Sequence, residues 1–201
     1  MANFDVQILD LITPATIDQA AMDGWAADGA REIINMMPPN LKEMCYQKNT
    51  FTSSSVGSES ETINTQEINS VYAGTVKCRM IDPKDKFKAA DANSIHLASA
   101  TDPVYYIEGG KLNILPASSS GIYYAIANPS VDVSNVDTIA NFPNELEYLV
   151  VLYVAIKIAE SQLIAEEDVE LYTPIITTLK QDYMQGIQNS SLVQKQQQGA
   201  K

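Results

Sequence analysis

The segment YLVVLYVAI, residues 148–156, is the most hydrophobic run of the chain and constrains the fold more than any other stretch. Asn144 and Glu147 precede it at the spacing of a capping box, which predicts that a helix begins here. Apolar residues lie on nearly every side of this helix, so other elements must enclose it on several sides. The run is nine residues long, far below the roughly 20 that a membrane span requires. We therefore expect a helix inside a bundle and no membrane association.

Two further segments predict helices that pack against this one. Residues 16–37 begin with Thr16 as N-cap, carry apolar residues at helical spacing and end at Pro38, because an interior proline loses a donor and clashes with the preceding turn. A second apolar stripe follows Pro174, which fits best as the first residue of the last helix with Thr173 as its cap. The three helices together predict a helical bundle.

Strands are expected between the helices. Residues 104–115 alternate apolar and polar side chains around Gly109-Gly110, which supplies the two positive φ angles of a type I′ hairpin turn. Residues 122–127 predict a third strand, so we expect an antiparallel meander. Residues 49–67 are rich in Ser and Thr and are expected to form a loop or an exposed hairpin. Residues 68–72 and 75–81 are each expected to form a strand.

These elements predict an α+β fold in which a helical bundle carries an inserted antiparallel β domain. The bundle comprises the N-terminal helix and two C-terminal helices, from residues 1–48 and 140–187. The β domain with its loops occupies residues 49–139. Residues 188–201 have low hydrophobicity and no acidic residue, so we expect a flexible, extended C-terminal tail.

Charge excludes broad classes of partner. The chain of 201 residues has a formal net charge of −12, which argues against a general nucleic-acid or anionic-membrane binder because both need clustered Lys and Arg. A candidate basic contact patch is the local exception: Lys77, Arg79, Lys84, Lys86 and Lys88. It fits either a contact with nucleic acid or an acidic protein, or an ordinary solvated strand edge.

Residues that carry chemistry are sparse. His96 is the only histidine, which excludes a multi-histidine metal site within one chain. A cluster of acidic residues precedes the last helix: Glu166, Glu167, Asp168 and Glu170. This cluster lacks the EF-hand spacing and fits a solvated helix start better than an acid–base or Ca²⁺ site. We therefore predict no catalytic residue, no cofactor and no metal.

Cysteine usage and the N-terminus predict a cytoplasmic type of soluble protein. Cys45 and Cys78 lack metal-ligand spacing, so we expect them to be reduced and structural. The first residues, MANFDVQILDL, have neither the basic nor the apolar region of a signal peptide.

The order of several motifs resembles a family of structural proteins of tailed bacteriophages, including marine ones. DGAREIINMMPP is followed by a variable Ser/Thr-rich stretch, then by ATDPVYYIEGGKLNILPA and YYAIANPSVD, and finally by FPNELEYLVVLYVAIKIAESQL. Over about residues 15–187 this order is similar to that of head-to-tail connector, or adaptor, proteins. The likeness to the adaptors, or nozzle proteins, of short-tailed phages is one of architecture.

The resemblance implies a ring, commonly of twelve subunits, in the virion neck at the head–tail interface. The ring would be made in the host cytoplasm, bind beneath the portal protein and join a downstream tail or nozzle protein. DNA would pass through its lumen without sequence-specific binding, and the family has no catalytic residues to transfer. The tail would be a tether, with these candidate contacts to the portal or a neighbouring subunit: Leu192, Val193, Lys195 and Lys201.

Several alternatives stay open at this point. Another neck or tail component, such as a tail terminator or tail-completion protein, fits the same residues. A small hydrolase that uses the acidic cluster belongs to a different class, and Ala substitutions at Glu166, Glu167 and Asp168 would then abolish an activity. The tail also fits a plain solvated terminus.

Overall fold

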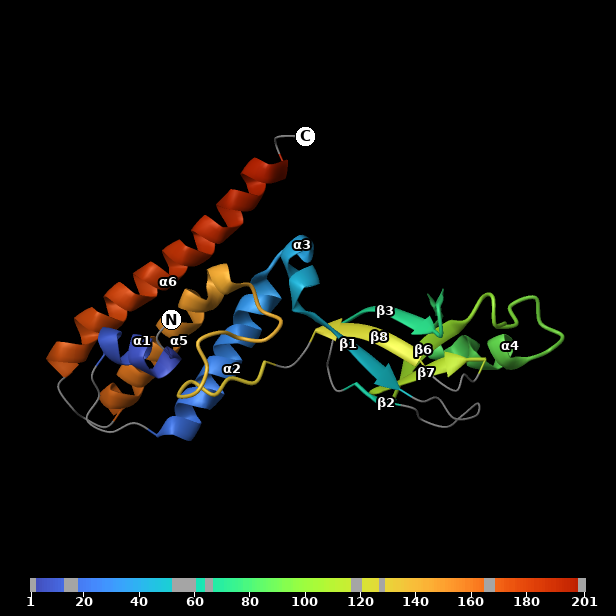
Figure 1. Cartoon of the computed structure of the whole chain (residues 1–201), viewed down its shortest axis with the longest axis horizontal. Coiled ribbons are helices and arrows are strands. Elements are labelled where there is room, and N and C mark those ends of the chain that lie inside the picture. The colour runs from blue at the N-terminus through green and yellow to red at the C-terminus, as the bar shows by residue number, and fades with distance from the viewer. Residues whose placement is uncertain are drawn as a thin grey trace. The chain divides into compact units, whose positions relative to one another are not determined.

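A computed structural model shows that the chain has an α+β fold, as expected (Figure 1). It describes the following residues: 3–12, 18–51, 61–63, 67–116, 121–126, 129–164 and 169–198. Within these ranges it leaves out the side chains of residues 51, 61, 62, 164, 171 and 191–198. The chain divides into two compact units, a helical unit from Met1–Cys45 and Asn128–Lys201 and a β unit from Tyr46–Ala127.

The helical unit is built around one buried helix. Its elements in chain order are α1 (Phe4–Leu11), α2 (Gln19–Met36), α3 (Pro39–Lys42), the 3₁₀ turns η1 (Glu43–Cys45) and η3 (Asn144–Leu146), α5 (Glu147–Ile164) and α6 (Val169–Gln198). Helix α5 contacts α1, α2 and α6, and Val154, Ala155 and Ala159 along it are fully buried. The enclosure expected for the hydrophobic run at 148–156 is thus confirmed. None of the helices that the structure describes is long and apolar enough to cross a membrane.

Two helix starts differ from the sequence prediction. Helix α2 begins at Gln19, and the carboxylate of Asp18 caps it by accepting the Ala20 N–H at 3.0 Å. The expected cap Thr16 lies outside the described residues, and Asp caps a helix at least as well as Thr. Helix α5 follows a 3₁₀ turn, and the carboxylate of Glu147 accepts the Ile139 N–H instead of closing a capping box.

Helix α6 starts earlier and ends later than expected. Pro174 lies inside the helix rather than at its first position, and because it follows the first turn its missing N–H removes one i→i−4 backbone hydrogen bond. Thr173 donates its hydroxyl proton to the Val169 carbonyl at 2.7 Å instead of capping a helix. The backbone then stays helical to Gln198, where the sequence predicts an extended tail, because Gln and Lys favour helix propagation.

In the part of the chain that the structure describes, the β unit contains two four-stranded sheets. Its elements are β1 (Tyr46–Phe51), β2 (Glu61–Thr62), β3 (Ile68–Ala73), β4 (Val76–Lys77), β5 (Arg79–Met80), η2 (Pro83–Asp85), α4 (Lys86–Ala90), β6 (Val104–Glu108), β7 (Lys111–Leu115) and β8 (Gly121–Ile126). One sheet has the order β1-β8-β3-β4 and the other the order β2-β7-β6-β5. Their strands pair antiparallel except for β5 and β6, which are parallel.

The predicted hairpin is confirmed, but the predicted meander is wrong. Gly109 and Gly110 turn between β6 and β7 with φ angles of +61° and +75°. Strand β8 pairs with β1 and β3 in the other sheet, not with β7. Tyr123 of β8 joins Ile114 of β7 in one hydrophobic cluster, so the core of the unit takes side chains from both sheets. The expected strand 75–81 is likewise divided at Cys78 into β4 and β5, one in each sheet.

The unit boundaries differ from those read from the sequence. Strand β1 already begins at Tyr46, where the sequence prediction still has the bundle. The connection after β8, assigned to the β domain in the prediction, belongs to the helical unit. Its Val133 N–H donates to the Asp23 carboxylate at 2.9 Å, and its Val133 carbonyl accepts the Asp5 N–H at 3.0 Å. Backbone hydrogen bonds to α1 and a side chain of α2 therefore hold this segment.

Candidate functional site

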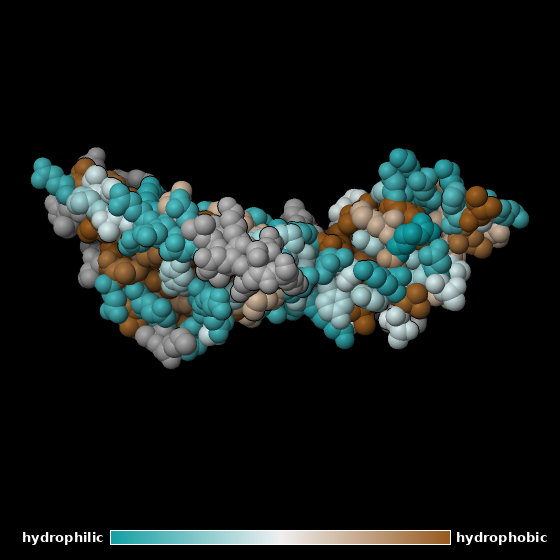
Figure 2. Space-filling model, turned by 90° about the horizontal axis from the view of Figure 1, so that it is seen from above, coloured by the Kyte–Doolittle hydropathy of each residue, from teal (hydrophilic) through white to brown (hydrophobic). Residues whose placement is uncertain are grey.

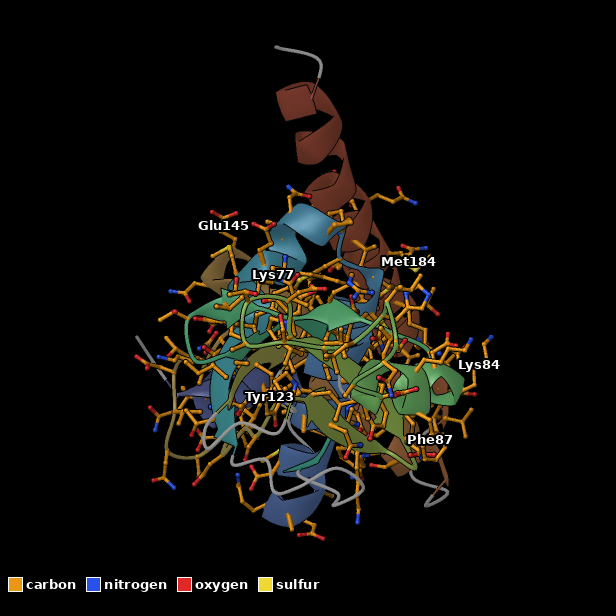
Figure 3. All side chains as sticks on the ribbon, turned by 90° about the vertical axis from the view of Figure 1, so that its right-hand side faces the viewer. Lys77, Lys84, Phe87, Tyr123, Glu145 and Met184 are labelled. Atoms are coloured by element: carbon orange, nitrogen blue, oxygen red, sulfur yellow. The ribbon has the colours of Figure 1, made fainter. Side chains whose placement is uncertain are left out.

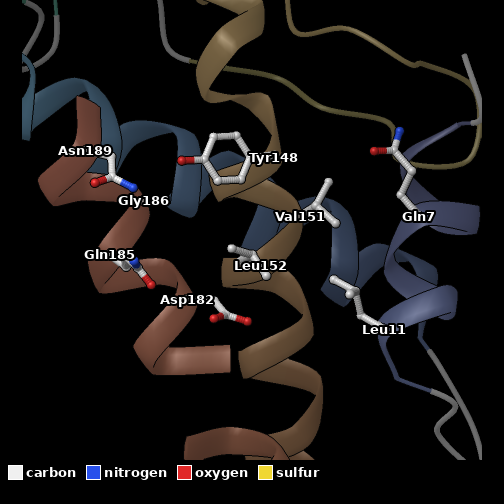
Figure 4. Close-up of a pocket in the computed structure, with 9 residues that line it drawn as sticks. All are labelled: Gln7, Leu11, Tyr148, Val151, Leu152, Asp182, Gln185, Gly186 and Asn189. Carbon is white, nitrogen blue, oxygen red and sulfur yellow. The ribbon is translucent and has the colours of Figure 1, made fainter. Parts of the chain in front are cut away.

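A groove lies on the helical unit between α1, α5 and α6 (Figure 4). One hollow of about 470 Å³ is lined by Gln7, Leu11, Tyr148, Val151, Leu152, Asp182, Gln185, Gly186 and Asn189. A second hollow of about 590 Å³ is lined by Asn40, Leu41, Met44, Pro143, Asn144, Glu145, Leu146, Tyr148, Asn189 and Ser190. Because Tyr148 and Asn189 line both hollows, we treat the two together as the helical groove.

The close approach of α6 to α5 shapes the wall of the helical groove. A Cβ added at Gly186 would lie 2.5 Å from Leu149 Cδ2 and 2.6 Å from the Tyr148 hydroxyl oxygen. Only glycine therefore lets α6 pass at this point without moving those side chains. Figure 4 shows the Tyr148 side chain directed toward α6 at Gly186 and Asn189.

The helical groove exposes apolar side chains and carries only acidic charge. Leu11, Met44 and Tyr148 are exposed large hydrophobic residues, and the charged residues of its lining are Glu145 and Asp182. Apolar surface gathered in a hollow and bordered by polar groups is typical of a protein or ligand contact. The groove is therefore the strongest candidate binding surface of the helical unit.

Further exposed apolar side chains occur on the β unit, in α4 and in the segments before and after it along the chain. These large hydrophobic side chains, which we call the apolar tip, are Met80, Phe87, Ile95 and Leu97. Phe87 is 72% exposed and Ile95 is 95% exposed. Figure 2 shows hydrophobic surface on both units, and Figure 3 shows Phe87 and Lys84 at the outer side of α4.

The predicted basic contact patch is largely neutralised. Four of its five cations form ion pairs: Arg79 with Asp102 (3.1 Å), Lys84 with Asp82 (3.0 Å), Lys86 with Glu108 (2.7 Å) and Lys88 with Asp85 (2.9 Å). Two of these carboxylates come from the region of the β6–β7 hairpin, more than 20 residues away along the chain. A nucleic-acid contact needs cations that can replace counterions, so these pairs argue against a uniform cationic face. Lys77 is exposed on β4.

Three of the other predicted contact residues lie in the last turns of one helix. Leu192, Val193 and Lys195 lie on the helical backbone of α6, which extends past α5 (Figure 1). Their side chains, and the whole of Lys201, lie outside the described residues. The same holds for three members of the acidic cluster, at 166–168, while Glu170 is exposed in the first turn of α6.

Thiols and histidine form no metal site among the described residues, where no group of three or more metal-ligating side chains occurs. Cys45 and Cys78 are free and buried, one in each unit. Burial raises the pKa of both thiols, that of Cys78 to about 11, which keeps them protonated and weakly reactive. His96 is exposed and borders a hollow with Asp85 and Lys88.

Sequence reasoning missed both the helical groove and the apolar tip. The sequence did carry a signal for the tip, since Ile95 and Leu97 stand in a charged connection where no strand or helix period explains them. It carried little signal for the groove, because helix α1 was not expected and the apolar run of α5 predicts enclosure on several sides. No protein-family model matches the chain, and no curated protein matches it.

Proposed function

We propose that this protein is a virion structural subunit that assembles into a ring-shaped head-to-tail adaptor of a tailed bacteriophage. The observation that carries the proposal is the position of the shared motifs. DGAREIINMMPP covers the end of α2, VYYIEGGKLNIL forms the β6–β7 hairpin, and FPNELEYLVVLYVAI contains η3 and the first half of α5. The motifs that resemble the adaptor family thus lie in helices and strands that build the fold. This is expected when the members of a family have their shape in common.

The exposed apolar surfaces support an assembly role. A subunit that buries surface against neighbours presents apolar side chains when seen alone. The helical groove exposes Leu11, Met44 and Tyr148, and the apolar tip exposes Phe87 and Ile95. These side chains are suited to burial against another protein.

The charge of the chain supports a passive DNA channel. Each subunit has a formal net charge of −12, so a ring of many copies is strongly acidic. Such a lumen neutralises no phosphates and releases no counterions, and DNA therefore gains little by binding to it. In this proposal DNA slides through the ring without sequence-specific contacts.

The test is association with the portal. The protein is produced together with the portal protein of the same phage, and the complexes are weighed by native mass spectrometry. We expect a ring of this subunit on the portal, and its density beneath the portal in a virion reconstruction. A protein that never joins portal rings or mature virions contradicts the proposal. Density at the far end of the neck, away from the portal, would instead identify a tail terminator or tail-completion protein.

A further inference from the structure

We propose that residues 188–198 of α6, which we call the α6 end, dock into the helical groove of a second copy of the chain. The inference rests on the proposed ring assembly and names the contact through which neighbouring copies meet. One half of the contact is a helix that extends past α5, and the other is a hollow with exposed apolar walls. Both halves belong to the helical unit, so each copy supplies one of each.

The α6 end does not reach the groove of its own chain. Helix α6 forms one wall of the groove at Gly186, Asn189 and Ser190, and it then stays helical to Gln198 (Figure 1). At about 1.5 Å per residue, residues 191–198 carry the helix about 12 Å beyond that wall. A straight helix does not turn back into a hollow that it has just lined. An α6 end that fills this groove therefore comes from another copy.

The apolar residues of the α6 end do not continue the stripe by which α6 packs on its own bundle. Leu192 follows buried Tyr183 by nine residues, which is about two and a half helical turns, so it lies on the opposite face of the helix. The positions that continue the buried stripe are Gln194 and Gln197. Burial of Leu192 therefore requires a surface outside its own bundle.

Charge favours the α6 end as the occupant. The charged residues that line the groove, Glu145 and Asp182, are acidic. Residues 183–201 contain lysines but no acidic residue, and Asp182 of the same helix lies about 20 Å from Lys195 along the helix axis. No carboxylate of its own helix therefore offsets the charge of Lys195. Opposite charges beside an apolar contact favour this pairing and fix its orientation.

The cation and the apolar residue share one side of the α6 end. Lys195 follows Leu192 by three residues, and residues at this spacing are neighbours on a helix surface. A groove that receives Leu192 thus meets Lys195 next to it. The α6 end has the pattern of a short amphipathic helix that binds along its apolar side.

The helical groove has a suitable size and lining for such a helix. Its two hollows of about 470 Å³ and 590 Å³ share Tyr148 and Asn189, so they form one continuous surface. Exposed Leu11 lines one hollow and exposed Met44 lines the other. Each hollow is within the range that holds a bulky apolar group, and an aliphatic anchor in such a hollow is a common centre of a protein interface.

The contact is heterologous, because an α6 end meets a groove rather than another α6 end. A heterologous contact leaves one end and one groove open in every incomplete oligomer, and it is completed when a ring closes. This geometry agrees with the ring of the proposed function. It also explains why a single copy presents both an extended helix and an open groove.

The first experiment uses two defective variants of the full chain. The end variant carries Leu192→Glu and Lys195→Glu, and the groove variant carries Leu11→Glu and Met44→Glu at exposed positions. Light scattering after size-exclusion chromatography gives the mass of each sample at high protein concentration. We expect oligomers from the unchanged chain and monomers from each variant alone. An equal mixture should give dimers and nothing larger, because only one intact end and one intact groove remain.

A charge exchange tests the polar half of the contact. Lys195→Glu alone should weaken self-association about tenfold, because it faces the carboxylates of the groove with a like charge. A chain that combines Lys195→Glu with Glu145→Lys and Asp182→Lys should regain association, because the two charges have changed places. A combined variant that associates no better than Lys195→Glu alone contradicts the inference.

Two controls separate this contact from a general effect of added charge. Met184→Glu changes an exposed residue of the same helix that lines neither hollow of the groove. Lys77→Glu makes the same charge reversal on exposed β4 of the other unit. Both should assemble like the unchanged chain. Helix content and melting temperature, measured for every variant, show that each is folded.

Several outcomes overturn the inference. They are an unchanged chain that stays monomeric at millimolar concentration, defective variants that assemble alone, and a mixture that stays monomeric. An end variant that self-associates normally but no longer binds the portal assigns the α6 end to the portal and also overturns it. Rings on the portal made from the end variant contradict the inference but not the adaptor. Dimers from the mixture, without portal binding by the unchanged chain, contradict only the adaptor.

Discussion

Gly29 of α2 lies directly against the ring of Tyr153 of α5. A Cβ added at Gly29 would be 2.7 Å from Tyr153 Cδ1 and 2.9 Å from Cγ. The Tyr153 ring also packs against Tyr183 of α6, with 6.1 Å between the ring centroids, and the Tyr183 hydroxyl donates to Glu32 of α2 at 3.2 Å. Two tyrosines thus join the three long helices at the point where a glycine leaves room.

Gly29→Ala should destabilise the protein. Overpacking a close contact costs about 1–3 kcal/mol, and the better helix propensity of Ala returns at most about 1 kcal/mol. The crowded atoms, Cγ and Cδ1, lie near the backbone of Tyr153 and have little freedom to move. We expect the free energy of unfolding in urea to fall by about 1–2 kcal/mol.

Gly24→Ala is the matched control on the same helix. Nothing lies within 4 Å of a Cβ added at Gly24, so the substitution adds helix propensity without a clash. We expect it to raise the free energy of unfolding by about 0.5–1 kcal/mol. Equal shifts in the two variants would mean that Gly29 does not touch Tyr153.

Gly110→Val should damage the β6–β7 hairpin. Gly110 has a φ of +75°, where a β-branched residue is strained by about 1–2 kcal/mol or more. We expect a lower melting temperature by circular dichroism. Gly109→Asn, at a φ of +61°, should be tolerated because Asn-Gly is a preferred type I′ pair. A Val variant as stable as the Asn variant would show that this turn is not a type I′ turn.

Glu147 should make part of the stability pH-dependent. The residue is 7% exposed, and its carboxylate accepts the Ile139 N–H at 2.6 Å. Burial raises the pKa of this carboxyl above its ordinary value of 4.5. The folded state therefore binds the proton more tightly than the unfolded state, and this contribution to stability declines as pH rises from about 4.5 through the folded pKa.

Glu147→Gln tests this dependence, because the amide keeps an oxygen that accepts the Ile139 N–H but does not ionise. We expect the urea midpoint of this variant to decline less between pH 4 and pH 7 than that of the unchanged chain. Glu147→Ala, which removes the acceptor, should cost about 1–3 kcal/mol. Parallel pH profiles for the Gln variant and the unchanged chain would contradict the prediction.

Deleting residues 191–201 should separate folding from attachment. Among the α6 residues whose side chains the structure describes, these buried ones precede the deletion: Tyr172, Ile176, Leu179 and Tyr183. We therefore expect a melting temperature close to that of the full chain, a small loss of helix content, and weaker attachment to the portal. Full-length Leu192→Ala with Val193→Ala keeps the helical backbone and tests the apolar side chains alone. Truncated protein that enters connectors as efficiently as the full chain would show that this segment is only a terminus.

The sequence by itself determined the features that depend on neighbouring residues. Apolar side chains on every face of 148–156 predict an enclosed helix, because a helix exposes each face within about one turn. Gly109-Gly110 between two alternating runs predicts the hairpin turn, because few other residue pairs adopt two positive φ angles in succession. Both predictions need no knowledge of distant parts of the chain, and both are confirmed.

Only the tertiary structure decided the features that depend on partners far along the chain. Strand β8 follows β7 closely in sequence but pairs with β1 and β3, since its alternation shows which face is buried and not which strand lies beside it. Lys86 looks like a free cation until the fold brings Glu108 to 2.7 Å. The local pattern of apolar and polar residues determines the conformation of a segment and its buried face, whereas long-range packing determines its neighbours. Those neighbours in turn determine which surfaces of this protein stay open for a partner.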